Sequence, residues 1–154
     1  MKLLLLLFSL AAIASAETVE IVADKFFTDE KKQITEFTGN VVASKNSNKL
    51  VAKKVVIIFD KNREPLQYTA TGDVEVDMTI NENIYFGSSE TMIYDPIKNQ
   101  YTFLTNAFFH EKVTNKKVYG DKIFVNQTTG RYEVESDGDE PVKFIFKVEK
   151  NSKK

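Results

Sequence analysis

Few residues of this chain combine the types and spacing that catalysis or metal binding requires. The single histidine, His110, follows Phe108 and Phe109, and the chain contains no cysteine. Zinc sites draw three or four ligands from Cys, His and carboxylate side chains. One imidazole without a second His or a thiolate does not form such a set. We therefore expect His110 to be an ordinary residue at the end of a strand.

A second candidate is a row of carboxylates that alternates with apolar residues over 73–78. Side chains on one face of a strand repeat about every 6.6–6.8 Å, whereas calcium needs oxygen ligands that converge at about 2.3–2.6 Å. The alternation instead predicts a strand with one buried and one solvated face. No nucleophile elbow, phosphate-binding glycine loop or Walker sequence is present. The sequence predicts a protein that is not an enzyme and that holds no metal or cofactor.

The N-terminus has the pattern of a secretion signal. Lys2 supplies a positive charge, residues 3–13 form an apolar run, and Ala14-Ser15-Ala16 is a small-residue cleavage site. A membrane-spanning helix needs about 20 apolar residues, which favours cleavage over a retained anchor. We expect a removed signal peptide over 1–16, one exported domain over 17–149 and a polar tail over 150–154.

The composition limits the partners and the means of stabilisation. The chain carries 21 Lys and Arg against 22 Asp and Glu, so there is no basic excess of the kind that binds nucleic acid. Without cysteine there are no disulfides and no lipidated N-terminal thiol. The fold must depend on backbone pairing and on an apolar core built largely from 12 Phe and 6 Tyr.

A sequence pattern of about thirty residues recurs along the chain. In each repeat a small residue opens an apolar run and an Asx turn follows. A second strand then leads to a bend of the backbone (a corner), such as 38–41 or 71–74. The small residues are Ala23, Ala52, Gly87 and Gly120, and the turns are at Asp29, Asp60, Asp95 and Asn126. Such repetition is typical of stacked units that bury one shared core.

Period-2 alternation predicts an all-β fold without helices. Strands are expected over 19–23, 37–43, 50–59, 73–78, 84–94, 101–109, 117–125, 132–136 and 142–148. Leu50, Ala52, Val56 and Ile58 are expected to share one strand face. The regular repeat favours a ribbed, open jelly roll with two antiparallel sheets over a closed barrel.

Several strands are apolar on both faces, notably 55–59, 101–109 and 144–146. This pattern fits either a sealed sandwich core or an apolar trough between two sheets. A trough could hold a lipid, since each buried methylene contributes about 0.8 kcal/mol and a dozen contribute on the order of 10 kcal/mol. Both alternatives remain open from the pattern alone.

Five elements in order resemble one family. They are Ala23-Asp24, Phe37-Thr38-Gly39-Asn40-Val41, Ala52-Lys53-Lys54-Val55, Gly87 with Met92 and Tyr94, and Gly120-Asp121-Lys122-Ile123. Over about residues 19–136 the chain is similar to the LptA/OstA-like periplasmic lipopolysaccharide transport family. Two departures are Lys53 in place of an Asp, and Thr105 where the third corner would carry Gly.

The resemblance implies a β-jellyroll of V-shaped section that carries lipopolysaccharide or lipooligosaccharide across the periplasm. It also implies two partners, an LptC-like inner-membrane protein and the N-terminal domain of an LptD-like outer-membrane translocon. Edge strands can add a neighbour by backbone pairing, and a head-to-tail contact extends into a filament. A homo-oligomer is therefore expected as well.

Strand alternation within this expected fold selects candidate groove residues. They are Val19, Ile21, Phe37, Val41, Leu50, Val56, Ile58, Met92, Tyr94 and Phe103. The candidate docking edges are Val19, Glu20, Ile21, Val22 and Ala23 at one end, and Val142, Lys143, Phe144, Ile145, Phe146, Lys147 and Val148 at the other. Lys143 and Lys147 are expected to limit promiscuous pairing of the second edge.

Three alternatives compete with a lipid carrier. The first is the membrane-anchored LptC-like partner of the same system, which the cleavage site disfavours. The second is a structural or adhesive β-solenoid with a dry core and no ligand. The third is an enzyme acting on envelope polysaccharide, which the missing catalytic residues disfavour.

Overall fold

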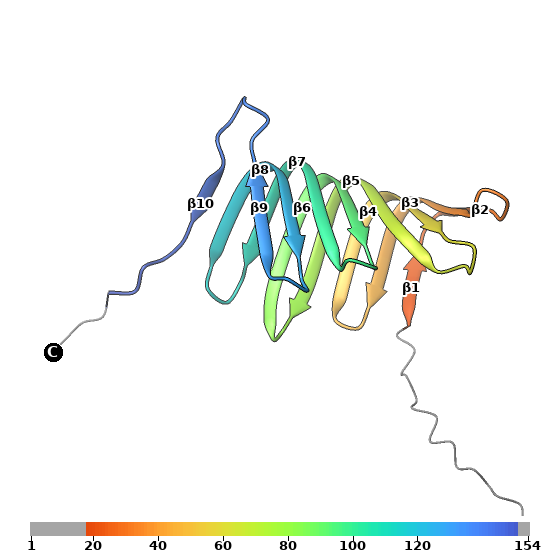
Figure 1. The fold of residues 1–154 in the computed structure, drawn as a ribbon, viewed down its shortest axis with the longest axis horizontal. Helices are drawn as coiled ribbons and strands as arrows, with labels where there is room; N and C mark the ends of the chain where they lie inside the picture. The colour runs from red at the N-terminus through yellow and green to blue at the C-terminus, as the bar shows by residue number, and fades with distance from the viewer. Residues whose placement is uncertain (1–17, 151–154) are drawn as a thin grey trace, which may run out of the picture.

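The structure, a computed structural model that describes residues 18–150, confirms the all-β expectation. Its strands are β1 (Val19–Val22), β2 (Lys25–Asp29), β3 (Ile34–Lys45), β4 (Asn48–Phe59), β5 (Pro65–Ile80), β6 (Asn83–Asp95), β7 (Gln100–Glu111), β8 (Lys116–Asn126), β9 (Arg131–Glu135) and β10 (Lys143–Ile145). They follow one another along the molecule as ribs (Figure 1). Within the described residues, no helix has the length and hydropathy to cross a membrane.

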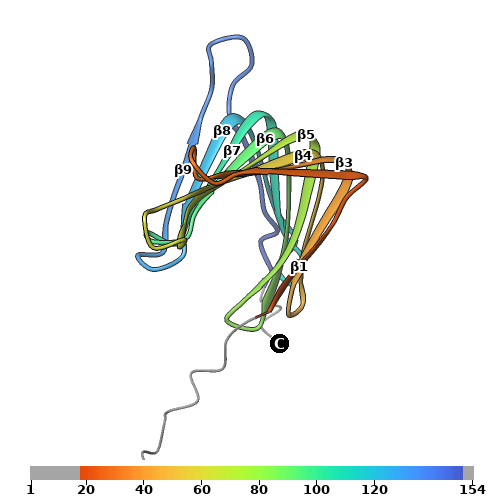
Figure 2. The same cartoon turned by 90° about the vertical axis from the view of Figure 1, so that its right-hand side faces the viewer.

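All strands belong to one antiparallel sheet with the order β1-β3-β4-β5-β6-β7-β8-β10. β2 pairs with β3, and β9 pairs with β8, beside this path. The sheet is folded along its length into a V, which is visible when the molecule is viewed end-on (Figure 2). The two sheets expected from the sequence are thus the two halves of a single sheet, because β3 to β8 each continue from one half into the other.

The fold line of the V coincides with a shift of register in every pair from β3/β4 to β7/β8. The backbone turns there through the left-handed region, with φ of 82° at Gly39 and 86° at Gly72. Glycine adopts this region without the steric cost that a Cβ imposes. The third corner is made by Thr105 at φ 68° and Asn106 at φ 50°. The corner is therefore kept where the sequence departs from glycine.

The fold line divides the sheet into two walls. Wall A contains β1, β10 and residues 41–45, 48–51, 74–80, 83–89, 107–111 and 116–120. Wall B contains β2, β9 and residues 34–38, 54–59, 65–71, 91–95, 100–104 and 122–126. Each end of the molecule therefore presents two edge strands, one from each wall.

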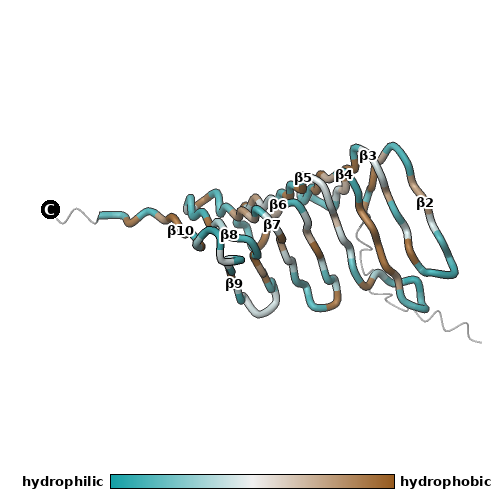
Figure 3. Tube along the Cα trace, turned by 90° about the horizontal axis from the view of Figure 1, so that it is seen from above, coloured by the Kyte–Doolittle hydropathy of each residue, from teal (hydrophilic) through white to brown (hydrophobic). Residues whose placement is uncertain are grey.

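The predicted Asx turns close the rim of wall B. The Oδ1 atom of Asp29 accepts hydrogen bonds from the backbone amides of Lys31 and Lys32 at 3.0 Å. Asp60, Asp95 and Asn126 accept equivalent backbone bonds. Most turns are hydrophilic while the strand centres are hydrophobic (Figure 3). The recurring turn chemistry of the sequence is confirmed.

The core lies between the walls and is densest in the middle of the molecule. The ring of Phe103, on wall B, faces Gly87 on wall A so closely that a Cβ at Gly87 would lie 2.8 Å from it. Phe109 packs beside Phe103 at a centroid distance of 5.9 Å and stacks on Tyr85 at 5.3 Å. The inter-wall space is therefore filled here by aromatic side chains.

The carboxylates of 73–78 lie on the solvated face. Val74, Val76 and Met78 are buried between them, as the alternation predicted. Asp73 forms an exposed ion pair with Lys53 at 3.1 Å, and Asp77 pairs with Lys112 at 3.6 Å. His110 lies near the rim end of β7, where its Nε2 is 2.8 Å from Oδ1 of Asn115.

Candidate apolar groove

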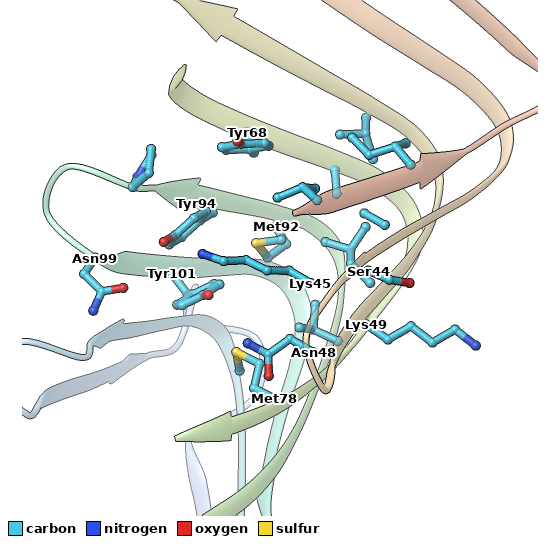
Figure 4. Close-up of a pocket in the computed structure, with 18 of the residues that line it drawn as sticks. Ser44, Lys45, Asn48, Lys49, Tyr68, Met78, Met92, Tyr94, Asn99 and Tyr101 are labelled. Carbon is cyan, nitrogen blue, oxygen red and sulfur yellow. The ribbon is translucent and has the colours of Figure 1, made fainter. Parts of the chain in front are cut away.

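A groove of about 280 Å³ opens between the walls toward the β1 end of the molecule. Its lining comes from strands β1 and β3 to β7 and from the turns at both rims (Figure 4). The lining residues are Val19, Ile21, Ala43, Ser44, Lys45, Asn48, Lys49, Leu50, Val55, Tyr68, Ala70, Val76, Met78, Met92, Tyr94, Pro96, Asn99, Tyr101 and Gln127. The inter-wall space is thus closed by the core in the middle and open here.

The floor of the groove is apolar and flexible in shape. Val55, Ala70 and Val76 from the central strands supply small buried side chains. Met78 and Met92 lie on opposite walls and complete this floor. Thioethers adapt to irregular apolar partners because the methionine side chain is unbranched and has three rotatable bonds. The floor can therefore accept an apolar chain of variable shape.

A row of three tyrosines forms the wall B side of the groove. Tyr68 and Tyr94 have ring centroids 5.8 Å apart, and Tyr94 stacks on Tyr101 at 4.4 Å. Burial, followed by the neighbouring Tyr94, raises the pKa of Tyr68 and of Tyr101 above the ordinary tyrosine value. The hydroxyls of Tyr68 and Tyr101 consequently stay neutral and act as hydrogen-bonding groups beside an apolar floor.

The mouth of the groove is polar. Lys45 is half-buried at the end of β3, and its side chain extends across the groove toward Tyr94 and Tyr101 (Figure 4). Asn48 and Asn99 stand at the two rims, from walls A and B respectively. The arrangement is amphipathic, with an apolar floor and hydrogen-bonding groups and a cation at the mouth.

Five of the ten predicted groove residues line this groove. They are Val19, Ile21, Leu50, Met92 and Tyr94. They come from three separate stretches of the sequence, and the folded sheet brings them together around one opening.

Three predicted groove residues lie in the core. Val41 and Phe103 are 0% exposed. Phe37 packs against the same core and stacks on Phe26 at 5.8 Å. These side chains face inward, as expected, but away from the open part of the inter-wall space.

The expected face of Val56 and Ile58 is wrong. Val55 and Ile57 are buried in the core, so the residues that alternate with them point to the outer surface, where Ile58 is 37% exposed. The cause is the register shift between Val51 and Lys54 at the fold line. One extra residue at a bulge reverses the inward and outward phase beyond it. Leu50 and Ala52 therefore face inward with Val55, rather than with Val56.

Sequence reasoning missed most of the polar mouth and part of the floor. Tyr68 and Ala70 share one face of β5, and Tyr101 shares a face of β7 with Phe103, so alternation within these strands was a signal that could have included them. Lys45 had no such signal, because a lysine beside a hairpin turn is ordinarily solvated. Its place at the groove follows from the fold of the sheet.

A second hollow lies at the wall B rim between residues 28–35 and 59–63, and its lining is mostly polar. Gln33 occupies part of this region, donating from Nε2 to the backbone oxygen of Asp60 at 2.9 Å. The Oδ1 atoms of Asp29 and Asp60 are engaged in their turns. Among the residues that the structure describes, no group of three or more His, Cys, Asp or Glu is arranged to hold a metal.

The two predicted docking edges are both on wall A. β1 pairs with β3 through its inner side, and β10 pairs with residues 117–119 of β8. The second strand is shorter than the predicted 142–148, because residues beyond Ile145 have no partner strand in the described chain; Val148 is 76% exposed. The wall B edges β2 and β9 were not predicted as docking edges, although Phe26 and Phe27 are exposed on β2.

Comparisons with known proteins agree with this architecture. A family model described as LptA/(LptD N-terminal domain) LPS transport protein matches residues 20–131. The fold is similar to the crystal structure of LptH, the LptA homologous periplasmic component of the lipopolysaccharide transport device from Pseudomonas aeruginosa. The TM-score is 0.75 and the identity 17%, over 86% of this chain and 96% of that chain. No curated protein matches the sequence.

Proposed function

Because the chain belongs to the LptA/LptD N-terminal domain family of lipopolysaccharide transport proteins, we propose that it carries lipopolysaccharide or lipooligosaccharide through the periplasm. It does so by holding acyl chains between its walls, without catalysing a reaction. The observation that supports this most directly is the open groove with its floor of Val55, Met78 and Met92. A sealed sandwich would leave no space there for an acyl chain.

The size of the groove suits transfer between sites. A volume of about 280 Å³ accommodates only part of a large glycolipid. Burial of roughly six methylenes would contribute about 5 kcal/mol, which is enough for capture and small enough for release to a neighbouring site of similar affinity. Transport therefore needs successive grooves rather than one tight site.

Assembly follows from the two edge strands at each end. A second copy that places its β9 and β10 against β2 and β1 would continue both walls at once by backbone pairing. Such a contact is heterologous and leaves new edges exposed, so it extends into a filament. The grooves of successive copies would then form one continuous apolar path. The exposed Phe144 and Phe146 at one end, and Phe26 and Phe27 at the other, supply apolar surface for this contact.

The same edges would serve the two ends of the path. An LptC-like protein anchored in the inner membrane and the N-terminal domain of an LptD-like translocon in the outer membrane would pair with opposite ends of the filament. This role requires export to the periplasm. The proposed signal peptide, residues 1–16, lies outside the described residues.

Site-specific photo-crosslinking tests the lipid role. A crosslinking side chain at Leu50 faces the groove, whereas one at Ile58 in the same strand faces the outer surface. We expect an adduct with co-purifying lipopolysaccharide at Leu50 and none at Ile58. Equal labelling at both positions would indicate non-specific adsorption. The protein for this test is purified from the envelope of the cells that produce it. If neither position then forms a lipid adduct, the ligand-free β-solenoid is favoured.

A further inference from the structure

We propose that Phe103 limits the length of acyl chain that the groove holds, because its ring closes the groove on the side opposite the β1 opening. A chain longer than one that just reaches Phe103 would bind no more tightly than that chain. This inference rests on the proposed lipid-carrier function and deepens it, since it assigns a chain-length limit to the same site.

One row of inward side chains crosses wall B from the groove into the core. Val55 of β4 is opposite Ala70 of β5, which is opposite Met92 of β6. These three side chains line the groove. The next residue in the row is Phe103 of β7, opposite Met92, and it is buried in the core. Among the described residues of this row, the groove lining therefore ends at Met92, beside the Phe103 ring.

A matching row crosses wall A and ends at the same place. Leu50 and Val76, which are opposite each other in β4 and β5, line the groove. The next residue is Gly87 of β6, opposite Val76. A Cβ at Gly87 would lie 2.8 Å from the Phe103 ring. Because carbon atoms in contact lie about 3.5–4.0 Å apart, no methylene fits between Gly87 and this ring.

Neighbouring aromatic rings hold Phe103 in place. Phe109 lies one strand beyond Gly87 on wall A, with its ring centroid 5.9 Å from that of Phe103. Tyr101 lies two residues before Phe103 in β7, at a centroid distance of 6.5 Å and an interplanar angle of 15°. Close-packed interiors of this kind resist displacement of one side chain. An acyl chain that reaches Phe103 therefore meets a fixed surface.

The closed end lies on the deep side of the V. Phe103 is two residues from the corner at Thr105, whereas Tyr101 is nearer the rim and lines the groove (Figure 4). A chain that has reached Phe103 would leave the floor toward the rims before it moves to the next copy. Transfer would then proceed in discrete steps from one groove to the next.

The dependence of affinity on chain length tests the limit. The purified full chain without its signal is titrated calorimetrically with alkyl maltosides from hexyl to tetradecyl, each below its micellar concentration. Burying one further methylene raises affinity about fourfold. We expect this rise to continue up to the octyl or decyl chain and then to level off, since roughly six methylenes are buried and the rest of the chain lies at the mouth.

Two matched variants connect the levelling-off to one side chain. Phe103→Leu and Phe109→Leu make the same truncation in one aromatic cluster, but only Phe103 borders the groove. Phe103→Leu should move the levelling-off to chains about two methylenes longer, so that dodecyl maltoside binds about tenfold more tightly and octyl maltoside binds as before. Phe109→Leu should leave the levelling-off where it is. A purely structural role of Phe103 would instead change the affinity for every chain length alike.

A second measurement uses the wild type, so that it does not depend on folding of the Phe103→Leu variant. Decyl maltoside with a photoreactive diazirine at the end of its alkyl chain is bound and irradiated, and the adduct is located by mass spectrometry. We expect labelling at Phe103, Met92 or Gly87. Labelling only elsewhere, as at the rim turns 46–47 and 96–99, would overturn the proposal.

The remaining outcomes separate this inference from the carrier function. If affinity rises without a break through tetradecyl maltoside, or if the break does not move in folded Phe103→Leu, the chain-length limit at Phe103 is wrong and the apolar groove stands. If no maltoside binds, or if affinity is the same for all chain lengths, the acyl-chain role is wrong as well.

Discussion

The rings of Tyr94 and Tyr101 stack at a centroid distance of 4.4 Å and an interplanar angle of 19° across the β6/β7 pair. The two residues are directly opposite in register, so the stack joins neighbouring strands of wall B at the mouth of the groove. Cross-strand aromatic pairs stabilise a sheet by roughly 0.2–1 kcal/mol. This pair therefore fixes the wall B side of the groove before any ligand binds.

The stack predicts a loss of stability in alkaline solution. Burial raises the pKa of Tyr101 in the folded chain above its ordinary value of 10.0. The unfolded chain ionises first as pH rises, so the contribution of Tyr101 is fully present below about pH 10 and is lost above it. Tyr101→Phe cannot ionise and should show a smaller decrease in unfolding free energy between pH 9 and 11. Urea denaturation across this range measures the difference, and parallel curves for the two proteins would contradict it.

At the third corner, a substitution of Thr105 should stabilise the fold. Thr105 is β-branched and lies at φ 68°, a region where such residues are strained. Thr105→Gly should raise the unfolding free energy by about 0.5–1 kcal/mol, the relief of strain being partly offset by the larger entropy of glycine in the unfolded chain. Thr102→Gly, in the extended part of β7, should instead lower it by about 0.5–1 kcal/mol. Equal destabilisation by both would show that the Thr105 corner is not strained.

Because the two walls approach closely at Gly87, we expect the stability of the fold to be sensitive to substitution there. A Cβ there would lie 2.8 Å from the Phe103 ring, which is 0% exposed and has little room to move. Gly87→Ala should therefore destabilise the fold by about 1–3 kcal/mol. Ser88→Ala, on the outer face of the same strand, should change it by less than about 0.5 kcal/mol. Chemical denaturation of both variants provides the comparison.

Removing the C-terminal segment should weaken self-association without lowering the stability of the fold. β10 pairs with β8 over three residues, and Lys143 lies 5.1 Å from the centroid of the Tyr119 ring. A chain ending at Asp139 should unfold at nearly the same urea concentration as the full chain, because a short exposed strand contributes little to global stability. It should lose self-association in analytical ultracentrifugation.

A point variant tests the same edge without removing it. Charge reversal at Lys143 and Lys147 should alter the association constant through the docking edge while the fold is retained. Unchanged self-association in this variant and in the shortened chain would exclude 142–148 from the interface.

The sequence predicted the ribbed all-β architecture because its signals are local. The Asx turns at Asp29, Asp60, Asp95 and Asn126 each depend on one side chain and the next few backbone amides. The alternation over 73–78 likewise depends on one strand. Both kinds of feature can be read without knowing which strands pair.

In β4 the inward face was predicted only as far as the fold line. Leu50 was placed correctly and Val56 was not, since the bulge between Val51 and Lys54 reverses the phase. A bulge in one strand is defined against its neighbour, so alternation within β4 alone does not locate it. The wall B edges were missed for a related reason, because β2 and β9 are short strands whose position follows from the pairing of the whole sheet.

The passage of β3 to β8 through both walls has a mechanical consequence. Two separate sheets could slide apart and widen their gap at little cost to either. Here, widening requires the backbone to flex at every corner from Gly39 to Asp121 while the ladders on each side remain intact. A bulky guest that pushed the walls apart at one strand would therefore strain the backbone corners of the neighbouring strands as well.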